Sequence, residues 1–223
     1  MNPLSVLRDS FYFSQRNLWA IAQLCLPLLV LESLGRQLVQ HLTGPDGSPV
    51  FDVLVGLLFY PLYTGALILF LDARSNGDAP RHRDLLAVAL RIWPMFALLA
   101  AISTLLIMLG MSMFVLPGLW VMVKLVFAEY LLVLRGLGPL AAIKQSLELS
   151  RGRFWQILAC ILAVLVPLWL LDGASAAIYP AGQNVLVDVI IDSLNSFLQL
   201  FTSVVMFRLF MLVTEPDLDP PAA

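Results

Sequence analysis

Six apolar stretches, each long enough to cross a bilayer, constrain the fold of this chain more than any other feature. They cover residues 18–35, 53–71, 92–110, 115–134, 155–172 and 190–212. The segments between them contain turn-forming residues, as in "TGPDGSP" (43–49) and "YPAGQN" (179–184). Only 13% of the residues are charged, which is too few to cover a water-soluble surface. The sequence therefore predicts an all-α, polytopic integral membrane protein with about six transmembrane helices.

Basic residues are divided unequally between the two sides that six spans create. Of 13 Lys and Arg residues, 11 fall on the side of the two termini, Arg36 falls on the other side, and Lys124 lies within a span. Because cytoplasmic loops carry the excess of Lys and Arg, we expect both termini to be cytoplasmic. We expect a single transmembrane domain over 1–213 and a short cytoplasmic tail over 214–223.

The segment before the first span recurs before the fifth. "VLRDSFYFSQRNLWAIAQLC" (6–25) aligns with "AIKQSLELSRGRFWQILACI" (142–161), and "RHRDLLAVALRIWPMFALLA" (81–100) is a weaker third copy. The alignment of the first two copies places Ser10 on Ser146, Ser14 on Ser150 and Trp19 on Trp155. Any cytoplasmic loop that re-enters a membrane tends to be basic and then aromatic, which would explain the tryptophans but not the matched serines.

These copies predict three cytoplasmic interfacial amphipathic helices, each followed by a helical hairpin, in repeats over 1–74, 75–136 and 137–213. The basic face of such a helix meets anionic headgroups, and a tryptophan marks the interface. The candidate headgroup-facing residues are Arg8, Arg16, Arg81, Arg83, Lys144, Arg151 and Arg153. We expect membrane lipids as partners and no nucleic acid, because no run of basic residues is present. A homo-oligomer and contacts with other membrane proteins both remain open.

The last span carries a row of polar residues within "VDVIIDSLNSFLQLFTSVVMFRLFMLV" (187–213). The row consists of Asp188, Asp192, Asn195 and Gln199, and Thr202 or Ser203 continues it. At 3.6 residues per turn these side chains share one face of a helix. A charge exposed to lipid costs from about 2.5 to more than about 10 kcal/mol, so this face should point at protein or at a water-filled cavity.

Lys124 and Glu129 of the fourth span are the expected partners of this polar row. Counted from the outer ends of the two helices at about 1.5 Å per residue, Lys124 lies level with Asp192, and Glu129 lies near the level of Asn195 and Gln199. An ion pair between Lys124 and Asp192 is therefore expected, as is a local pair between Glu32 and Arg36. Two interpretations of the polar row stay open: contacts that hold two helices together, or the lining of a wet path or headgroup pocket.

Residues that support catalysis or metal binding do not form a recognisable set. Cys25 and Cys160 lie in apolar stretches, and His41 and His82 are isolated in predicted loops. No nucleotide-binding, metalloprotease or triad motif is present. We expect no catalytic residue, no cofactor and no metal site, and therefore no enzyme.

Three stretches carry a resemblance to a known family. "SVLRDS", "LPGLWVMVKLVFAEYLLVLRGLGPLAAIKQSLELSRGRFW" and "FRLFMLV" together resemble the YciC family of bacterial inner-membrane proteins. The middle stretch is also similar to the membrane domain of some glycerophosphodiester phosphodiesterases, whose soluble catalytic domain the sequence lacks. The resemblance implies a multi-pass protein of a Gram-negative inner membrane. Because the molecular activity of that family is unassigned, no functional residue carries over.

Two functions remain in competition at this point. The basic segments and the resemblance favour a non-enzymatic role in envelope maintenance, through lipid handling or assistance to other membrane proteins. The alternative is a small transporter or channel that uses the polar row of the last span together with Lys124 and Glu129.

The expected topology can be tested by cysteine labelling. Cysteines placed at Ser48 and Ala174 should react with a membrane-impermeant maleimide in intact spheroplasts, because both positions are predicted to lie outside. A cysteine at Asn76 should react only after lysis. The reverse labelling pattern would refute the predicted orientation.

Overall fold

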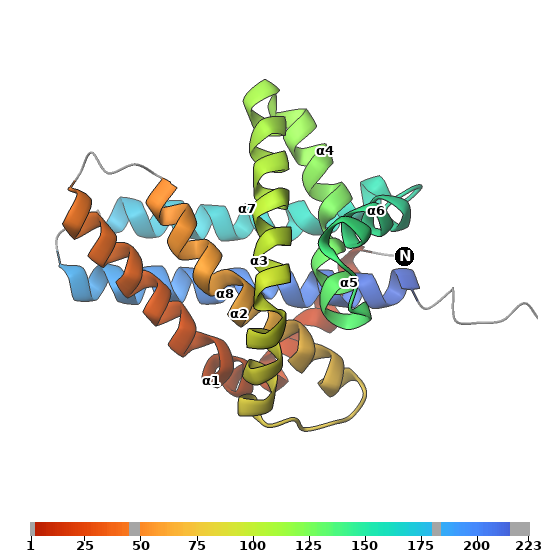
Figure 1. Ribbon diagram of the computed structural model, residues 1–223, viewed down its shortest axis with the longest axis horizontal. Coiled ribbons are helices and arrows are strands. Elements are labelled where there is room, and N and C mark those ends of the chain that lie inside the picture. Colours follow the sequence, from red (N-terminus) through yellow and green to blue (C-terminus); the bar gives the residue numbers. More distant parts are fainter. Residues whose placement is uncertain (1–2, 45–49, 180–183, 215–223) are drawn as a thin grey trace, which may run out of the picture.

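A computed structural model describes residues 3–44, 50–179 and 184–214, and these residues contain helices and no strand. The elements are α1 (Pro3–Thr43), α2 (Val50–Ser75), α3 (His82–Met113), α4 (Val115–Leu125), α5 (Ala128–Arg135), α6 (Pro139–Leu149), α7 (Phe154–Ile178) and α8 (Val185–Thr214) (Figure 1). The described residues leave out most of two predicted loops, at 43–49 and 179–184. They also leave out most of the predicted tail over 214–223.

The prediction of six membrane spans is confirmed by six helices of sufficient length and apolarity. These helices cover Val6–Thr43, Val50–Ser75, His82–Met113, Val115–Arg135, Phe154–Ile178 and Val185–Thr214. The fourth span consists of α4 and α5, with a two-residue turn at Val126 and Phe127 between them. The chain is therefore an all-α, multi-pass membrane protein.

The prediction of three separate interfacial helices is wrong for two of the three copies. Only α6 is a helix of its own, whereas the first copy continues into α1 and the weaker copy into α3. The separation of α6 from α7 depends on Gly152, whose φ of +75° is a left-handed conformation that ends a helix readily. Arg16 and Leu90 occupy the corresponding positions in the other copies, and both are good helix formers.

α1 is too long to cross a bilayer in one direction. Its 41 residues would extend about 60 Å if straight, roughly twice the thickness of the hydrocarbon core. Figure 1 shows that α1 changes direction along its length, so that its first part packs beneath other helices. The amphipathic segment predicted to lie at the interface thus stays helical, but it is joined to the span that follows it.

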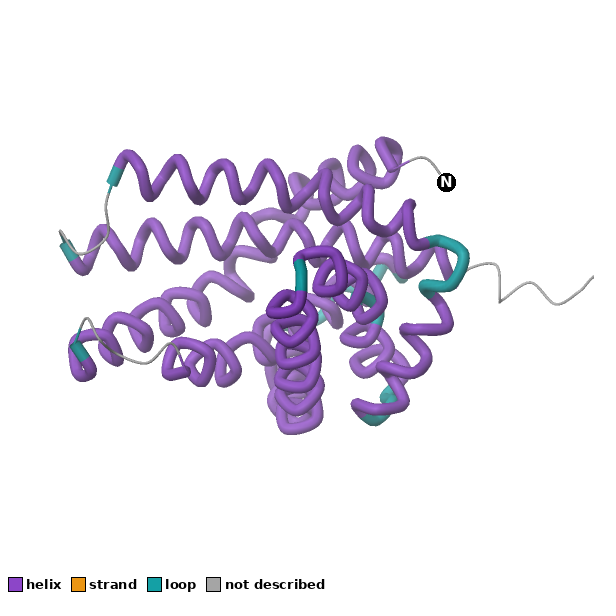
Figure 2. Tube along the Cα trace, turned by 90° about the horizontal axis from the view of Figure 1, so that it is seen from above, coloured by secondary structure: helices purple, strands orange, loops and turns teal. Residues whose placement is uncertain are grey.

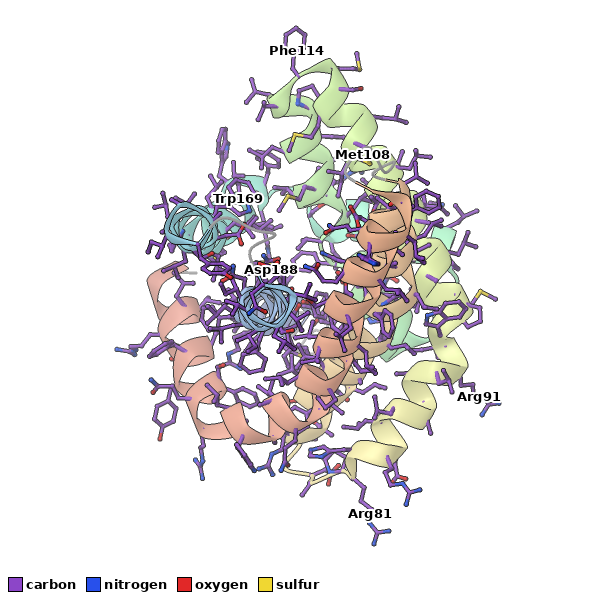
Figure 3. The ribbon with its side chains drawn as sticks, turned by 90° about the vertical axis from the view of Figure 1, so that its left-hand side faces the viewer. Arg81, Arg91, Met108, Phe114, Trp169 and Asp188 are labelled. Carbon is purple, nitrogen blue, oxygen red and sulfur yellow. The ribbon has the colours of Figure 1, made fainter. Side chains whose placement is uncertain are left out.

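The hairpin of α3 and α4 projects away from the rest of the molecule. It stands upright in Figure 1, where α7 and α8 run across it, and the quarter turn in Figure 2 views it nearly end-on. Its tip is apolar on all sides, with Met113, Phe114, Val115 and Leu116 each at least 68% exposed. Figure 3 places Phe114 at this tip and Arg81 at the opposite end of the molecule. Lipid rather than water must surround such a tip, because an exposed apolar surface of this kind is unfavourable in water.

Two glycines allow the two arms of this hairpin to touch. A Cβ atom on Gly110 would lie 2.8 Å from the Gly118 Cα and 2.9 Å from the Gly118 nitrogen, distances that real Cβ atoms do not reach. Because both neighbours are backbone atoms, they cannot move aside as a flexible side chain would. Small residues play this role generally where membrane helices approach closely.

The turn that interrupts the fourth span is stabilised by Ser146 of α6. The Phe127 amide donates a hydrogen bond to Ser146 Oγ at 3.2 Å, and Ser146 Oγ donates to the Lys124 carbonyl at 2.7 Å. Ser146 is fully buried, so the two backbone groups freed by the turn would otherwise have no partner. The position of α6 against α4 and α5 follows from this contact.

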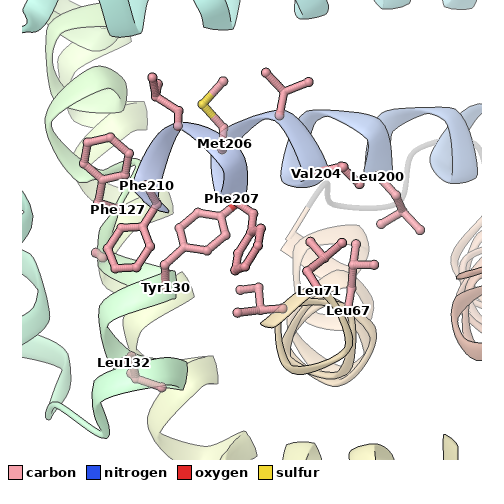
Figure 4. Close-up of a cluster of buried hydrophobic side chains, with 14 of the residues drawn as sticks. Leu67, Leu71, Phe127, Tyr130, Leu132, Leu200, Val204, Met206, Phe207 and Phe210 are labelled. Carbon is pink, nitrogen blue, oxygen red and sulfur yellow. The ribbon is translucent and has the colours of Figure 1, made fainter. Parts of the chain in front are cut away.

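A cluster of buried hydrophobic side chains lies where α8 crosses α2 and α5 (Figure 4). Tyr130 stacks on Phe210 with ring centroids 5.6 Å apart, and Phe127 lies 5.9 Å from Phe210. Leu67 and Leu71 of α2 lie at the other side of this cluster and are fully buried. The Tyr130 hydroxyl donates to the Ser203 carbonyl at 2.9 Å, which supplies the partner that a buried tyrosine needs.

The close contact at Gly110 predicts a strong effect of a single methyl group. Gly110→Ala should lower the free energy of unfolding by about 1–3 kcal/mol, because the hairpin must open to admit the Cβ atom. Gly173→Ala is the matched control, since no atom lies within 4 Å of its Cβ position in α7. Thermal unfolding in detergent should separate the two variants, and equal melting temperatures would contradict the tight contact.

Candidate functional site

The helices border a partly open cavity of about 670 Å³, here called the central cavity, which is lined by residues of α1, α2, α3, α5, α7 and α8. Its polar lining consists of Glu32, Arg36, Asp52, Tyr60, Tyr63, Thr64, Ser103, Thr104, Glu129, Ser196, Gln199, Thr202 and Ser203. Apolar residues such as Leu57, Ile107 and Leu165 complete the wall. A volume of this size is typical of ligand sites.

A hydrogen bond between α2 and α5 forms part of the cavity wall. The Tyr60 hydroxyl donates to Glu129 Oε1 at 2.7 Å. Glu129 is the first acidic residue of α5, immediately after the turn that Ser146 stabilises. The interruption of the fourth span thus determines how Glu129 faces the cavity. Tyr60 precedes Pro61, and the Trp93 indole donates to the Leu58 carbonyl at 2.9 Å, so this part of α2 is fixed by α3 as well.

Several buried polar atoms of the cavity wall have no hydrogen-bond partner among the described residues. They include Asp52 Oδ1, Thr64 Oγ1 and Thr202 Oγ1, and Thr64 is only 1% exposed. Leaving a buried polar group unpaired costs about 1–3 kcal/mol. Water or the polar part of a ligand inside the cavity would supply the missing partners.

The charges of the central cavity are unbalanced. Glu32, Asp52 and Glu129 supply three carboxyl groups, and Arg36 is the only basic residue among the described residues of the lining. The expected local pair between Glu32 and Arg36 is confirmed as a salt bridge. Asp52 and Glu129 are left without a cation among the described residues, so the cavity is suited to a group that is positively charged or donates several hydrogen bonds.

The polar row of the last span is divided between two environments. Gln199 lines the central cavity with Glu129, as expected from their depth, and Thr202 and Ser203 line it as well. Asn195, expected at the same depth, does not line it. Asp192 instead accepts a long hydrogen bond of 3.5 Å from Ser33 of α1. Asn195 donates to Asp172 Oδ1 and Ser175 Oγ of α7, each at 2.9 Å. These contacts hold α8 to α1 and α7, so part of the row joins helices and part lines a cavity.

Asp188 begins the row near the start of α8, where its residue is 6% exposed (Figure 3). It lies outside the lining of the central cavity.

The expected ion pair between Lys124 and Asp192 is wrong. The Lys124 ammonium lies 5.8 Å from the Trp120 ring centroid and donates to the Ser150 carbonyl at 3.4 Å. Depth along the helix was the basis of the expected pair, but depth does not say toward which side a residue points. Lys124 faces α6, whereas Glu129, five residues later, faces the central cavity.

The seven candidate headgroup-facing cations are positioned consistently with that role. Arg8, Arg16, Arg81, Arg83, Lys144 and Arg151 are exposed. Arg153 is half-buried and donates to the Val213 carbonyl at 3.5 Å. Contact of these residues with headgroups stays a prediction.

Sequence reasoning missed the contribution of α2 to the site. Tyr60, Tyr63 and Thr64 occur in "YPLYT" at a spacing that places them on one face of a helix. This spacing beside Pro61 could have indicated a polar face on α2. Tyrosine counts as an apolar residue in the composition, so the hydroxyl groups were overlooked. Asp52 was missed because it lies near the start of α2, where an acidic residue is unremarkable.

Within the described part of the chain, no three His, Cys, Asp or Glu residues lie close enough together to hold a metal ion. Both cysteines are buried, and neither they nor His41 and His82 line the central cavity.

Comparison with known proteins places the chain beside bacterial membrane proteins. It is 28% identical over 170 residues to proteins named "UPF0259 membrane protein" from Yersinia pestis (strain Pestoides F) and from Yersinia pseudotuberculosis (serotype O:1b). The alignment covers 76% of this chain, which spans 64% of the length of these curated relatives. No family model matches the chain. No solved structure matches it either.

The hydrogen bond between Tyr60 and Glu129 predicts energetic coupling between the two residues. Tyr60→Phe and Glu129→Met, each of which removes one partner of the bond, should each destabilise the protein by about 1–3 kcal/mol. The double variant should lose about 0.5–3 kcal/mol less than the sum, because the two residues share one bond. Thermal unfolding in detergent measures these losses, with Tyr12→Phe as the control at an exposed tyrosine. Strictly additive losses would show that the bond does not form.

Proposed function

We propose that this chain is a non-enzymatic membrane protein that binds a phospholipid headgroup in the central cavity. We further propose that this binding serves lipid handling in a bacterial inner membrane, with both termini in the cytoplasm. The observation that carries the proposal is the set of buried, unpartnered polar atoms in a cavity between membrane-spanning helices. In an apolar medium such atoms require a polar occupant.

The charges of the cavity favour a headgroup that carries an ammonium group. Asp52 and Glu129 lack a cationic partner among the described residues and could accept hydrogen bonds from an ammonium ion. Arg36 lies in the same lining, so the phosphate of the same headgroup would have a guanidinium nearby. Phosphatidylethanolamine combines these two groups. A purely anionic headgroup would instead face an excess of carboxylates.

The surroundings of the cavity suit acyl chains. Leu57, Ile107 and Leu165 supply an apolar part of the wall. The α3–α4 hairpin diverges from α7 and α8, so apolar helix faces are open to lipid beside the cavity (Figure 1). A lipid could therefore place its headgroup among the polar side chains and keep its chains in the membrane.

Lipid retention by the purified chain tests this proposal. After extensive washing in detergent, mass spectrometry should detect phosphatidylethanolamine in preference to phosphatidylglycerol. The double variant Asp52→Asn, Glu129→Gln should reduce this retention about tenfold or more, because two charge-assisted hydrogen bonds are weakened. Asp84→Asn with Glu148→Gln is the matched control, since both residues are exposed and lie outside the cavity lining. Equal retention by wild type, variant and control would overturn the proposal.

A small transporter or channel is the second candidate function. A second cavity of about 500 Å³, here called the basal cavity, is lined by parts of α1 and α2 and by Val204, Phe207 and Arg208 of α8. The two cavities meet α8 at consecutive residues, Ser203 and Val204, which favours a path along this helix. Lys124, expected to take part, lines neither cavity.

Flux measurements distinguish the two functions. Liposomes that contain the protein and a pH-sensitive dye report proton entry. Lipid retention without flux above that of protein-free liposomes supports lipid handling. Flux that Glu129→Gln abolishes, without any lipid preference, supports the transporter.

A further inference from the structure

The basal cavity brings together three arginines from three different helices. Arg16 of α1, Arg74 of α2 and Arg208 of α8 line it, and among the described residues Asp9 is the only acidic one in the lining. Asp9 forms no ion pair with these arginines. The three arginines are exposed, and because like charges that share a cavity repel one another, a bound anion would lower their repulsion.

One of the three guanidinium groups is held in place from within the protein. Arg74 Nε donates to Asn17 Oδ1 at 3.1 Å, and Asn17 Nδ2 donates to the Phe13 carbonyl at 3.0 Å. Asn17 is buried, so this chain of bonds orients Arg74 and leaves its terminal nitrogens available. In the described part of the protein, Arg16 and Arg208 have no hydrogen-bond or ion-pair partner.

Ser10 supplies an independent indication that the cavity takes a ligand. Its residue is 1% exposed, it lines the basal cavity, and its Oγ has no hydrogen-bond partner within the described residues. Ser146, the corresponding serine of the later repeat copy, bonds to the backbone groups that the turn in the fourth span leaves free. The first part of α1 packs instead against α8, which runs as one continuous helix from Val185 to Thr214. No free backbone group is therefore offered to Ser10 there, and its hydroxyl remains available.

We propose that the basal cavity binds a phosphate group, held by Arg16, Arg74 and Arg208 and by the Ser10 hydroxyl. A phosphate has several acceptor oxygens, and guanidinium groups donate to them in parallel pairs. The group could belong to an anionic phospholipid or to a water-soluble phosphate compound, and both offer the same chemistry. This site shares no lining residue with the central cavity, so it does not depend on the function proposed there.

The proposal is more specific than a general attraction between basic residues and a membrane surface. Arg91 is also exposed and basic, but it lines neither cavity and is not one of the candidate headgroup-facing residues. If the cavity is a site, removing one of its arginines should matter far more than removing Arg91. If attraction is diffuse, the position of the lost charge should not matter.

Thermal unfolding of the full chain in detergent tests the site. Inorganic phosphate is titrated against chloride at equal ionic strength, so that general screening is the same in both series. In a parallel series, phosphatidylglycerol or phosphatidylcholine is added to the micelles. Ligand that binds the folded state raises the melting temperature, and the dependence on concentration gives an apparent Kd.

We expect Arg16→Gln and Arg208→Gln each to weaken binding about tenfold or more, and Arg91→Gln to leave it unchanged. Ser10→Ala should weaken binding without lowering the melting temperature of the ligand-free protein, because the lost hydroxyl had no partner to lose. Stabilisation by inorganic phosphate would identify a soluble phosphate compound as the ligand type, and stabilisation by phosphatidylglycerol alone would identify a headgroup. No stabilisation in either series, or an equal loss in Arg91→Gln, would overturn the proposal.

Discussion

Polar groups inside an apolar medium need hydrogen-bond partners. This requirement applies both to the backbone at the turn of the fourth span and to the side chains that line the two cavities. Where the fourth span is interrupted, Ser146 supplies the partners of the freed backbone groups. The structure records seven buried side-chain nitrogen or oxygen atoms without a partner in the described residues. All except Ser193 Oγ belong to residues that line the central or the basal cavity. The buried polar atoms without a partner are therefore concentrated around the two cavities rather than distributed through the core.

The number and type of the spans could be predicted from the sequence because hydropathy accumulates over about 20 residues in each span. The ends of the helices could not. α1 and α3 extend well beyond their apolar stretches, since polar residues such as Arg16 and Arg91 continue a helix as readily as apolar ones. The single glycine at Gly152 decides that α6 is separate. One backbone conformation thus determines an element boundary that composition does not reveal.

The sequence could predict which residues of the last span share a face. It could not predict most of their partners on other helices. Helical periodicity placed Gln199 and its neighbours on a common face, and Glu129 does lie in the same cavity as Gln199. The partners of the remaining polar residues depend on how each helix is rotated about its axis, which one sequence does not contain. Lys124 therefore contacts Ser150 and Trp120 rather than Asp192. Tyr60 was not predicted because its ring is apolar, although its hydroxyl donates a hydrogen bond to Glu129 Oε1 in the cavity wall.

The three segments that resemble one another in sequence lie in different surroundings in the structure. Trp19 and Trp155 are 74% and 77% exposed, as expected at a membrane interface, whereas Trp93 donates its indole hydrogen to α2. Ser146 bonds to the backbone at the turn between α4 and α5, whereas the segment of Ser10 packs against the continuous helix α8. The charges divide in the same way: carboxylates gather in the central cavity, and guanidinium groups gather in the basal cavity. Under the two proposals made above, the same fold selects two different ligands, because selectivity depends on the side chains that line each cavity.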